Sequence, residues 1–129
     1  MGIILILLTL TFRAYCPEYR CLYIEKAEGI NHYEPLIKAI TRYESLNGVY
    51  VWNAQEQAVG WFQIRPCRVD AYNKATGNNY RLADFYDYNL SRKMFLFYAH
   101  GKSYEQAAKN WNGSGKMTID YWKHIKTLL

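Results

Sequence analysis

Residues 35–46 read PLIKAITRYESL and form the strongest helical pattern in this chain of 129 residues. Pro35 suits the first turn of a helix, where the missing N–H group costs no hydrogen bond. Apolar side chains then repeat at helical spacing, for example at Ile37 and Ile40, and Gly48 follows where a helix commonly ends. We therefore predict a helix over residues 35–46 that packs its apolar face against the rest of the domain.

Glu44 stands on the apolar face of this helix. Successive helical residues turn by about 100°, so Ile37, Ile40 and Glu44 fall within one narrow stripe. A carboxylate there is partly desolvated, and in the last turn it also faces the negative end of the helix dipole. Both effects raise the pKa of the carboxyl group, which suits a general acid near neutral pH. The alternative is a solvated glutamate paired with Arg42 or Lys38.

The chain beyond this helix predicts a short extended segment followed by further helices. Val49–Trp52 is β-branched and aromatic, as in a short strand or extended loop. Ser103 and Gln106 have the spacing of a capping box, and Thr118 is predicted to cap a final helix. The other predicted helices cover residues 66–76 and 87–99, with a weaker one at 18–29. The expected fold class is α+β, predominantly helical, with about five helices and a small extended insert.

Length and composition indicate one folded domain with an anionic partner. Half of the residues are hydrophobic, and 16 Lys and Arg against 11 Asp and Glu give a formal charge of +5. This charge favours a nucleic acid, a membrane surface or a bacterial wall. The basic residues are scattered and do not interleave with the aromatic ones, so nucleic acid is the least favoured partner.

The N-terminal residues predict export. Gly2–Phe12 is an apolar run of eleven residues, too short for a membrane span of about 20 residues but suited to a signal peptide. We predict that residues 1–14 are a signal peptide or short apolar leader, and that residues 18–129 are the functional domain. The alternative is a first strand or helix buried in the core.

The cysteines and histidines do not predict a metal site. Export would permit one disulfide, with Cys21 and Cys67 the preferred pair and Cys16 left over. The alternative is that the cysteines are small buried apolar side chains. No cysteine pair has zinc-site spacing, and the three histidines are not grouped as ligands, so we expect no metal and no cofactor.

Four short motifs follow one another in the chain: Glu44-Ser45, GWFQI at Gly60–Ile64, NWNG at Asn110–Gly113, and Tyr121. In this order and spacing they resemble the motifs of soluble-type (SLT-like) lytic transglycosylases. That family shows a Glu-Ser pair at a helix end, a Gly-Leu-Met-Gln-Ile-like stretch, an Ala-Tyr-Asn-x-Gly-like stretch and a late tyrosine. The resemblance covers residues 35–129.

The resemblance implies a lysozyme-like fold with a cleft between the helices and the insert. It also implies cleavage of the β-1,4 bond between N-acetylmuramic acid and N-acetylglucosamine in peptidoglycan, with a 1,6-anhydro product. Glu44 would be the sole catalytic acid and base. Gln63 would contact the sugar, and Tyr121 would hydrogen-bond near Glu44. The implied substrate-binding residues are Ser45, Trp61, Gln63, Trp111, Asn112 and Tyr121.

The chain departs from the family pattern at two positions in and before the second motif. Trp61-Phe62 replaces Leu-Met, which changes the shape of the sugar trough. Ala54 stands where many members have a serine, so that hydroxyl is absent or its role falls to Asn53. Among the carboxylates expected near the cleft, Glu56 is the best candidate for a second catalytic acid.

Two other functions fit the same motifs. A goose-type-like lysozyme would hydrolyse the same bond, and a non-catalytic cell-wall-binding module would keep the cleft without the reaction. Each reading places the chain, as a monomer, at the periplasm or cell envelope with peptidoglycan strands as its partner. A role in secretion, conjugation, or phage assembly and lysis fits equally.

Overall fold

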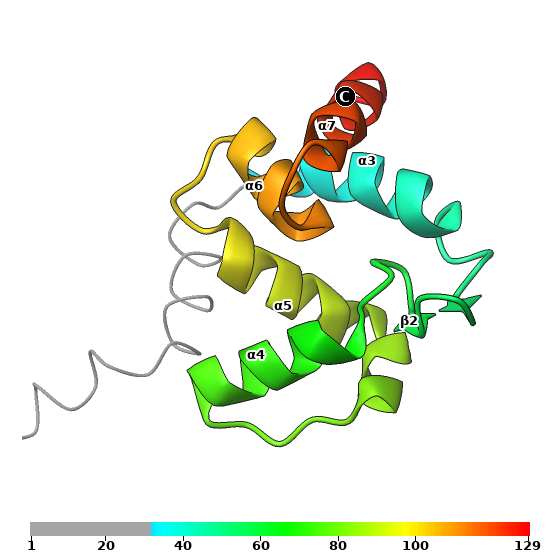
Figure 1. The fold of residues 1–129 in the computed structure, drawn as a ribbon, viewed down its shortest axis with the longest axis vertical. Coiled ribbons are helices and arrows are strands. Elements are labelled where there is room, and N and C mark those ends of the chain that lie inside the picture. Colours follow the sequence, from blue (N-terminus) through cyan, green and yellow to red (C-terminus); the bar gives the residue numbers. More distant parts are fainter. Residues whose placement is uncertain (1–31) are drawn as a thin grey trace, which may run out of the picture.

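The structure is a computed structural model that describes residues 32–129 (Figure 1). Three predictions fall outside the described residues: the leader of residues 1–14, the weak helix of residues 18–29, and the Cys16 and Cys21 thiols. Within the described part, Cys67 is an exposed free thiol.

The described residues form five α-helices and one two-stranded sheet, which confirms the predicted predominantly helical α+β class. The strands β1 and β2 pair antiparallel, with Trp52 opposite Val59 and Asn53 opposite Ala58. In chain order the elements are α3 (Glu34–Ser45), β1 (Trp52–Asn53), β2 (Ala58–Val59), α4 (Pro66–Thr76), the 3-10 helix η2 (Leu82–Tyr86), α5 (Tyr88–Ala99), α6 (Tyr104–Asn112) and α7 (Met117–Thr127). In Figure 1, α5 lies between α4 and α6. The segment between α3 and α4, which carries both strands and is called the insert below, lies beside the end of α3.

Local signals set most helix ends as predicted. Leu46 adopts a left-handed conformation with φ of 50° and closes α3 through its N–H group. The capping box at α6 is confirmed, because the Ser103 hydroxyl accepts from the Gln106 N–H while the Gln106 side chain accepts from the Ser103 N–H.

One local prediction was wrong in detail. The helix α7 begins at Met117, and the Thr118 hydroxyl donates to the Gly115 carbonyl at 2.7 Å instead of capping the helix. The segment Val49–Trp52, predicted as a short strand or extended loop, is mostly loop, and only Trp52 joins a strand. The residues before it bridge α3 to the sheet, since the Tyr50 N–H donates to the Ser45 carbonyl.

An aromatic core holds the helices together beneath the insert. The Phe62 ring stacks on Phe95 at 5.6 Å, and Trp111 meets both rings edge-on. Burying a side chain of this size stabilises the fold by about 1.5–3 kcal/mol. Because Phe62 and Trp111 belong to two of the predicted motifs, this packing fixes those motifs relative to each other.

Gly60 fixes the insert against the 3-10 helix. Its φ of +76° favours glycine, and a Cβ atom would lie 2.2 Å from the Phe85 carbonyl oxygen. The chain passes so close to η2 that no larger residue fits. This backbone contact fixes the position of the insert three residues before Gln63.

Candidate active site

Glu44 lies in the last turn of α3 and lines a cavity of about 340 Å³. The wall of this cavity comes from α3, the insert, the start of α4, the end of α6, and α7. Four of the six predicted substrate-binding residues line the same cavity: Gln63, Trp111, Asn112 and Tyr121. Each of the four motifs, which lie far apart in the chain, thus contributes at least one residue to the wall of this cavity.

Burial raises the pKa of Glu44 from 4.5 to about 7. This value is the net result: the hydrogen bond from Tyr121 and the charges of Arg65 and Arg68 lower the pKa, and the Glu56 carboxylate adds to the rise. Burial outweighs these opposing effects because charging a desolvated carboxyl group is costly. The predicted direction of the shift is confirmed, and Glu44 forms no ion pair with any described residue.

Tyr121 holds one oxygen of this carboxyl group. Its hydroxyl donates to Glu44 Oε1 at 2.7 Å, and its ring meets the Tyr43 ring edge-on at 5.2 Å. Burial raises the pKa of Tyr121 well above its usual value, so the hydroxyl keeps its proton and remains a donor. Oε2 of Glu44 is left available for proton transfer.

Gln63 is held in an unusual conformation at the edge of the cavity. Its φ of 49° lies in the left-handed region, which is uncommon for a residue other than glycine. The side-chain Nε2 donates to the Tyr50 carbonyl at 3.1 Å and to the Gly60 carbonyl at 3.0 Å. Since both donor bonds go to the backbone, the Gln63 side-chain oxygen can accept from a ligand hydroxyl.

Trp111 and Asn112 form the wall at the end of α6. Trp111 is buried, and its indole N–H donates to the Phe62 carbonyl at 3.2 Å. The Asn112 carbonyl accepts from Arg65 at 2.9 Å, which fixes its backbone relative to α4. Asn112 is therefore presented to the cavity by a rigid helix end.

Ser45 and Trp61 do not line this cavity. The Ser45 hydroxyl is buried, donates to the Trp61 carbonyl at 2.9 Å and accepts from the Gly48 N–H at 2.9 Å. The Trp61 ring packs edge-on against Tyr88 at 5.0 Å. Both residues tie the insert to the helices, so the structure gives them a supporting position behind the cavity.

The predicted second acid, Glu56, does line the cavity. Its carboxylate pairs with Arg65 at 3.8 Å, and its side chain is 56% exposed. Asp120 also lines the cavity and pairs with Lys123 at 3.0 Å. Glu44 therefore differs from both of these carboxylates by being desolvated and free of an ion pair.

Asn53 lines the cavity, whereas Ala54 lies outside it. The Asn53 side-chain oxygen accepts from the N–H groups of Gln55 and Glu56 and so stabilises its own turn. Its side-chain nitrogen is the group left to contact a ligand.

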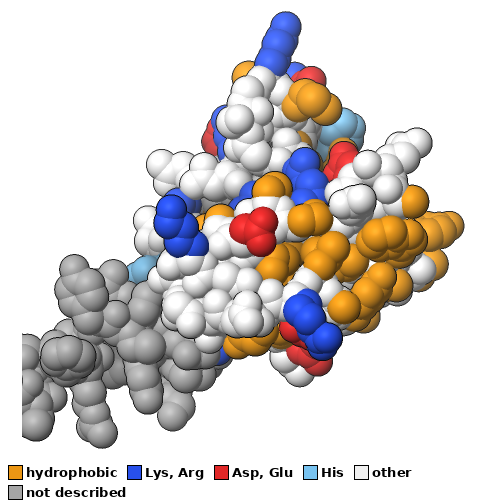
Figure 2. Space-filling model, turned by 60° about the horizontal axis from the view of Figure 1, so that its bottom comes forward, with side chains coloured by type: hydrophobic (Ala, Val, Ile, Leu, Met, Phe, Trp, Pro, Cys, Tyr) orange, Lys and Arg blue, Asp and Glu red, His pale blue; other side chains and the backbone are white. Residues whose placement is uncertain are grey.

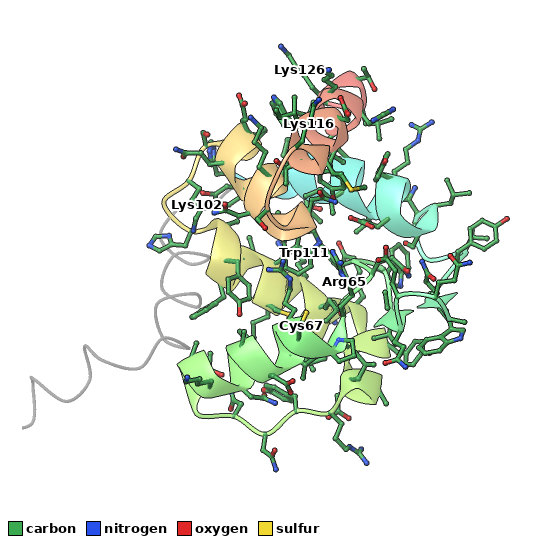
Figure 3. The ribbon with its side chains drawn as sticks, in the orientation of Figure 1. Arg65, Cys67, Lys102, Trp111, Lys116 and Lys126 are labelled. Carbon is green, nitrogen blue, oxygen red and sulfur yellow. The ribbon has the colours of Figure 1, made fainter. Side chains whose placement is uncertain are left out.

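Arg65, directly after the GWFQI motif, and Arg68, three residues later, were not predicted as site residues. Their spacing of three residues at the start of a predicted helix was the available signal, because such residues share one face. Figure 3 shows Arg65, Cys67 and Trp111 close together in the middle of the molecule. Lys102, Lys116 and Lys126 lie towards the periphery in the same view.

Comparisons with protein-family models, curated proteins and solved structures find no match to this chain. Across residues 32–129, no three side chains are grouped as metal ligands. Over the same residues, no helix has the length and apolar character needed to cross a membrane.

Proposed function

We propose that this chain is a peptidoglycan lytic transglycosylase with a lysozyme-like fold, in which Glu44 is the single catalytic acid and base. The observation that carries the proposal is the state of Glu44: a desolvated carboxyl group with a pKa of about 7, held by Tyr121 at the wall of a cavity. A pKa near the working pH lets one group both give and accept a proton.

The reaction needs both protonation states of Glu44 in turn. Protonated Glu44 donates to the glycosidic oxygen as the bond to the anomeric carbon breaks. The N-acetyl group of the muramoyl sugar stabilises the positive charge on that carbon. The Glu44 carboxylate then accepts the proton of the C6 hydroxyl as the C6 oxygen bonds to the anomeric carbon. The product is a 1,6-anhydro sugar, no water is consumed, and Glu44 ends protonated as it began.

The arrangement around Glu44 supports these two steps. Tyr121 donates to the carboxyl group in either protonation state, while Arg65 and Arg68 favour the charged form that follows the first proton transfer. Gln63 from the insert and Asn112 from the end of α6 offer polar groups to sugar hydroxyls. The substrate requires the chain to reach the periplasm or cell envelope.

Hydrolysis of the same bond is the second candidate function, and one observation favours it. Glu56 lines the cavity with Glu44, and a hydrolase uses a second carboxylate as nucleophile or as base for water. The ion pair with Arg65 stabilises the charged Glu56 carboxylate that such a role needs. Its exposure leaves it solvated, however, which makes the single-acid mechanism the better supported one.

Variants at these two carboxylates separate the candidates. We would measure release of soluble muropeptides from purified sacculi by the full chain, Glu44→Gln, Glu56→Gln and the remote control Glu105→Gln. The proposal predicts that only Glu44→Gln abolishes release. Loss of release in Glu56→Gln would favour hydrolysis. Binding to sacculi without release by any form would leave a non-catalytic wall-binding module.

A further inference from the structure

A second cavity of about 600 Å³ adjoins the cavity around Glu44. The two share five lining residues, among them Arg65, Arg68 and Asn112, so these residues lie at the boundary between the two cavities. The side cavity extends from these residues towards Tyr98 on α5 and the loop after α6. Its volume falls within the range of about 300–1,000 Å³ that small-ligand sites occupy.

Arg68 is held rigidly at the junction of the two cavities. Its Nη2 donates to the Trp111 carbonyl at 2.8 Å and to the Asn110 carbonyl at 3.2 Å. The guanidinium also lies 4.5 Å from the centre of the Trp111 ring and 5.2 Å from that of Tyr98. The side chain is therefore preorganised, so little conformational entropy is lost when it binds an anion.

The charge of Arg68 is not matched by a carboxylate. No described acidic residue forms an ion pair with it, and its Nε and Nη1 have no acceptor in the described part of the chain. Burial lowers the pKa of Arg68, which shows that the charged form has lost hydration. A partly buried charge with free donors is stabilised by an anion that accepts a charge-assisted hydrogen bond from Nε or Nη1.

Arg65 adds a second positive charge to the same wall. Its one carboxylate partner is Glu56, at 3.8 Å, so the junction carries two guanidinium groups against one paired carboxylate. Tyr98 contributes a further polar atom beside Arg68: its hydroxyl is buried with no hydrogen-bond partner among residues 32–129.

We propose that the side cavity is a carboxylate-binding subsite, in which Arg68, assisted by Arg65, receives the peptide branch of the glycan. This inference rests on the proposed function and deepens it, since it names a second recognised part of the substrate. The muramoyl sugar beside the scissile bond carries a peptide whose free carboxylates can accept from the Arg68 donors that have no partner among the described residues. A sugar bound next to Glu44 would direct that branch into the adjoining cavity.

Changing the ligand gives a test that no folding defect can imitate. The probe is a wall disaccharide carrying a dipeptide with free carboxylates, compared with the same compound after conversion of its carboxylates to primary amides. Binding is measured by isothermal titration calorimetry on the full chain with Glu44→Gln, which prevents turnover. We expect amidation to weaken binding roughly tenfold, as loss of a charge-assisted hydrogen bond requires.

Variants at arginine positions test whether the preference for the carboxylate probe over its amide arises in this cavity. Arg68→Gln in the Glu44→Gln background should bind both probes with nearly equal affinity. Arg68→Lys keeps the positive charge but loses the planar guanidinium group, so it should retain only part of the preference. The matched control is Arg81→Gln, because Arg81 is exposed, lines neither cavity and pairs with Asp84. It should keep the full preference.

These experiments distinguish failure of the carboxylate-binding subsite from failure of the transglycosylase proposal. Equal affinity for the two probes, or a preference that survives Arg68→Gln, would overturn the subsite even if the chain cleaves sacculi. A preference that depends on Arg68 would support the subsite even if the wild-type chain releases no muropeptides, and the transglycosylase proposal alone would then fail.

Discussion

Replacing Glu44 by glutamine should stabilise the fold above neutral pH. Burial raises the pKa of the Glu44 carboxyl group to about 7 in the folded chain, so the folded state binds this proton more tightly than the unfolded state. The free energy of unfolding must therefore fall as pH rises from 4.5 through about 7 and stay lower above it. Glutamine has no such ionisation, and its side-chain oxygen can still accept the hydrogen bond from Tyr121.

The size of this effect follows from the shift. A carboxyl pKa raised from 4.5 to about 7 corresponds to about 3 kcal/mol of lost stability above neutral pH. The cavity opens to solvent, which screens part of the charge, so we expect a net gain of about 2 kcal/mol in Glu44→Gln. A gain of this sign is typical of a site where function is maintained at the expense of stability.

Urea unfolding measures the effect directly. The two chains should have similar unfolding free energies at about pH 4 and differ by about 2 kcal/mol at about pH 8. Glu105→Gln is the control, because Glu105 is an exposed residue paired with Lys109, and it should follow the wild type at both pH values. If Glu44→Gln also follows the wild type, Glu44 ionises as a solvated group and the reasoning about a desolvated acid fails.

Three further substitutions test separate parts of the account. Tyr121→Phe removes a hydrogen bond that lowers the pKa of Glu44, so the alkaline limb of the pH–rate profile should move to higher pH; an unmoved limb would contradict this role. Ser45→Ala should cost about 1–3 kcal/mol in urea unfolding, because the Trp61 carbonyl loses its buried partner, while KM for glycan stays unchanged. A raised KM at normal stability would instead place Ser45 in contact with substrate. Gly60→Ala should cost at least about 2 kcal/mol, since it adds a backbone clash to a strained φ, and a folded chain of normal melting temperature would refute that packing.

Local signals were sufficient for the helices and for the central acid. The apolar stripe of residues 35–46 predicted both the helix and the desolvation of Glu44, because both depend on spacing within a single element. The capping box at Ser103 likewise needs only residues that are neighbours in the chain. The protonation behaviour of Glu44 was thus predictable in direction.

Features that depend on contacts between distant segments were not predictable. Trp61 belongs to a predicted sugar-binding motif, yet its ring turns towards Tyr88, which follows it by 27 positions in the sequence and packs beside it only in the folded chain. Arg68 gains its position from the carbonyl groups that end α6, more than 40 residues away. The spacing of residues within one element predicts neither the orientation of the Trp61 ring nor the position of the Arg68 side chain.

The exposure of side chains around the insert was likewise not predictable from local sequence. Several large apolar side chains are exposed at the end of α3 and in the segment that leads to β1, namely Leu46, Val49, Tyr50 and Trp52. Figure 2 shows apolar side chains gathered on one side of the molecule. The β-branched and aromatic pattern of Val49–Trp52 predicted a short strand or extended loop, and it left open whether these side chains are buried; in the folded chain all but Val51 are exposed.

The mass of the products released from peptidoglycan tests the central claim most directly. Sacculi digested by the full chain would be analysed by mass spectrometry, with Glu44→Gln alongside. The account predicts muropeptides lighter by one water molecule than the corresponding reducing-end forms, and none from the variant. Reducing-end products that depend on Glu44 would contradict the single-acid transglycosylase and identify a hydrolase.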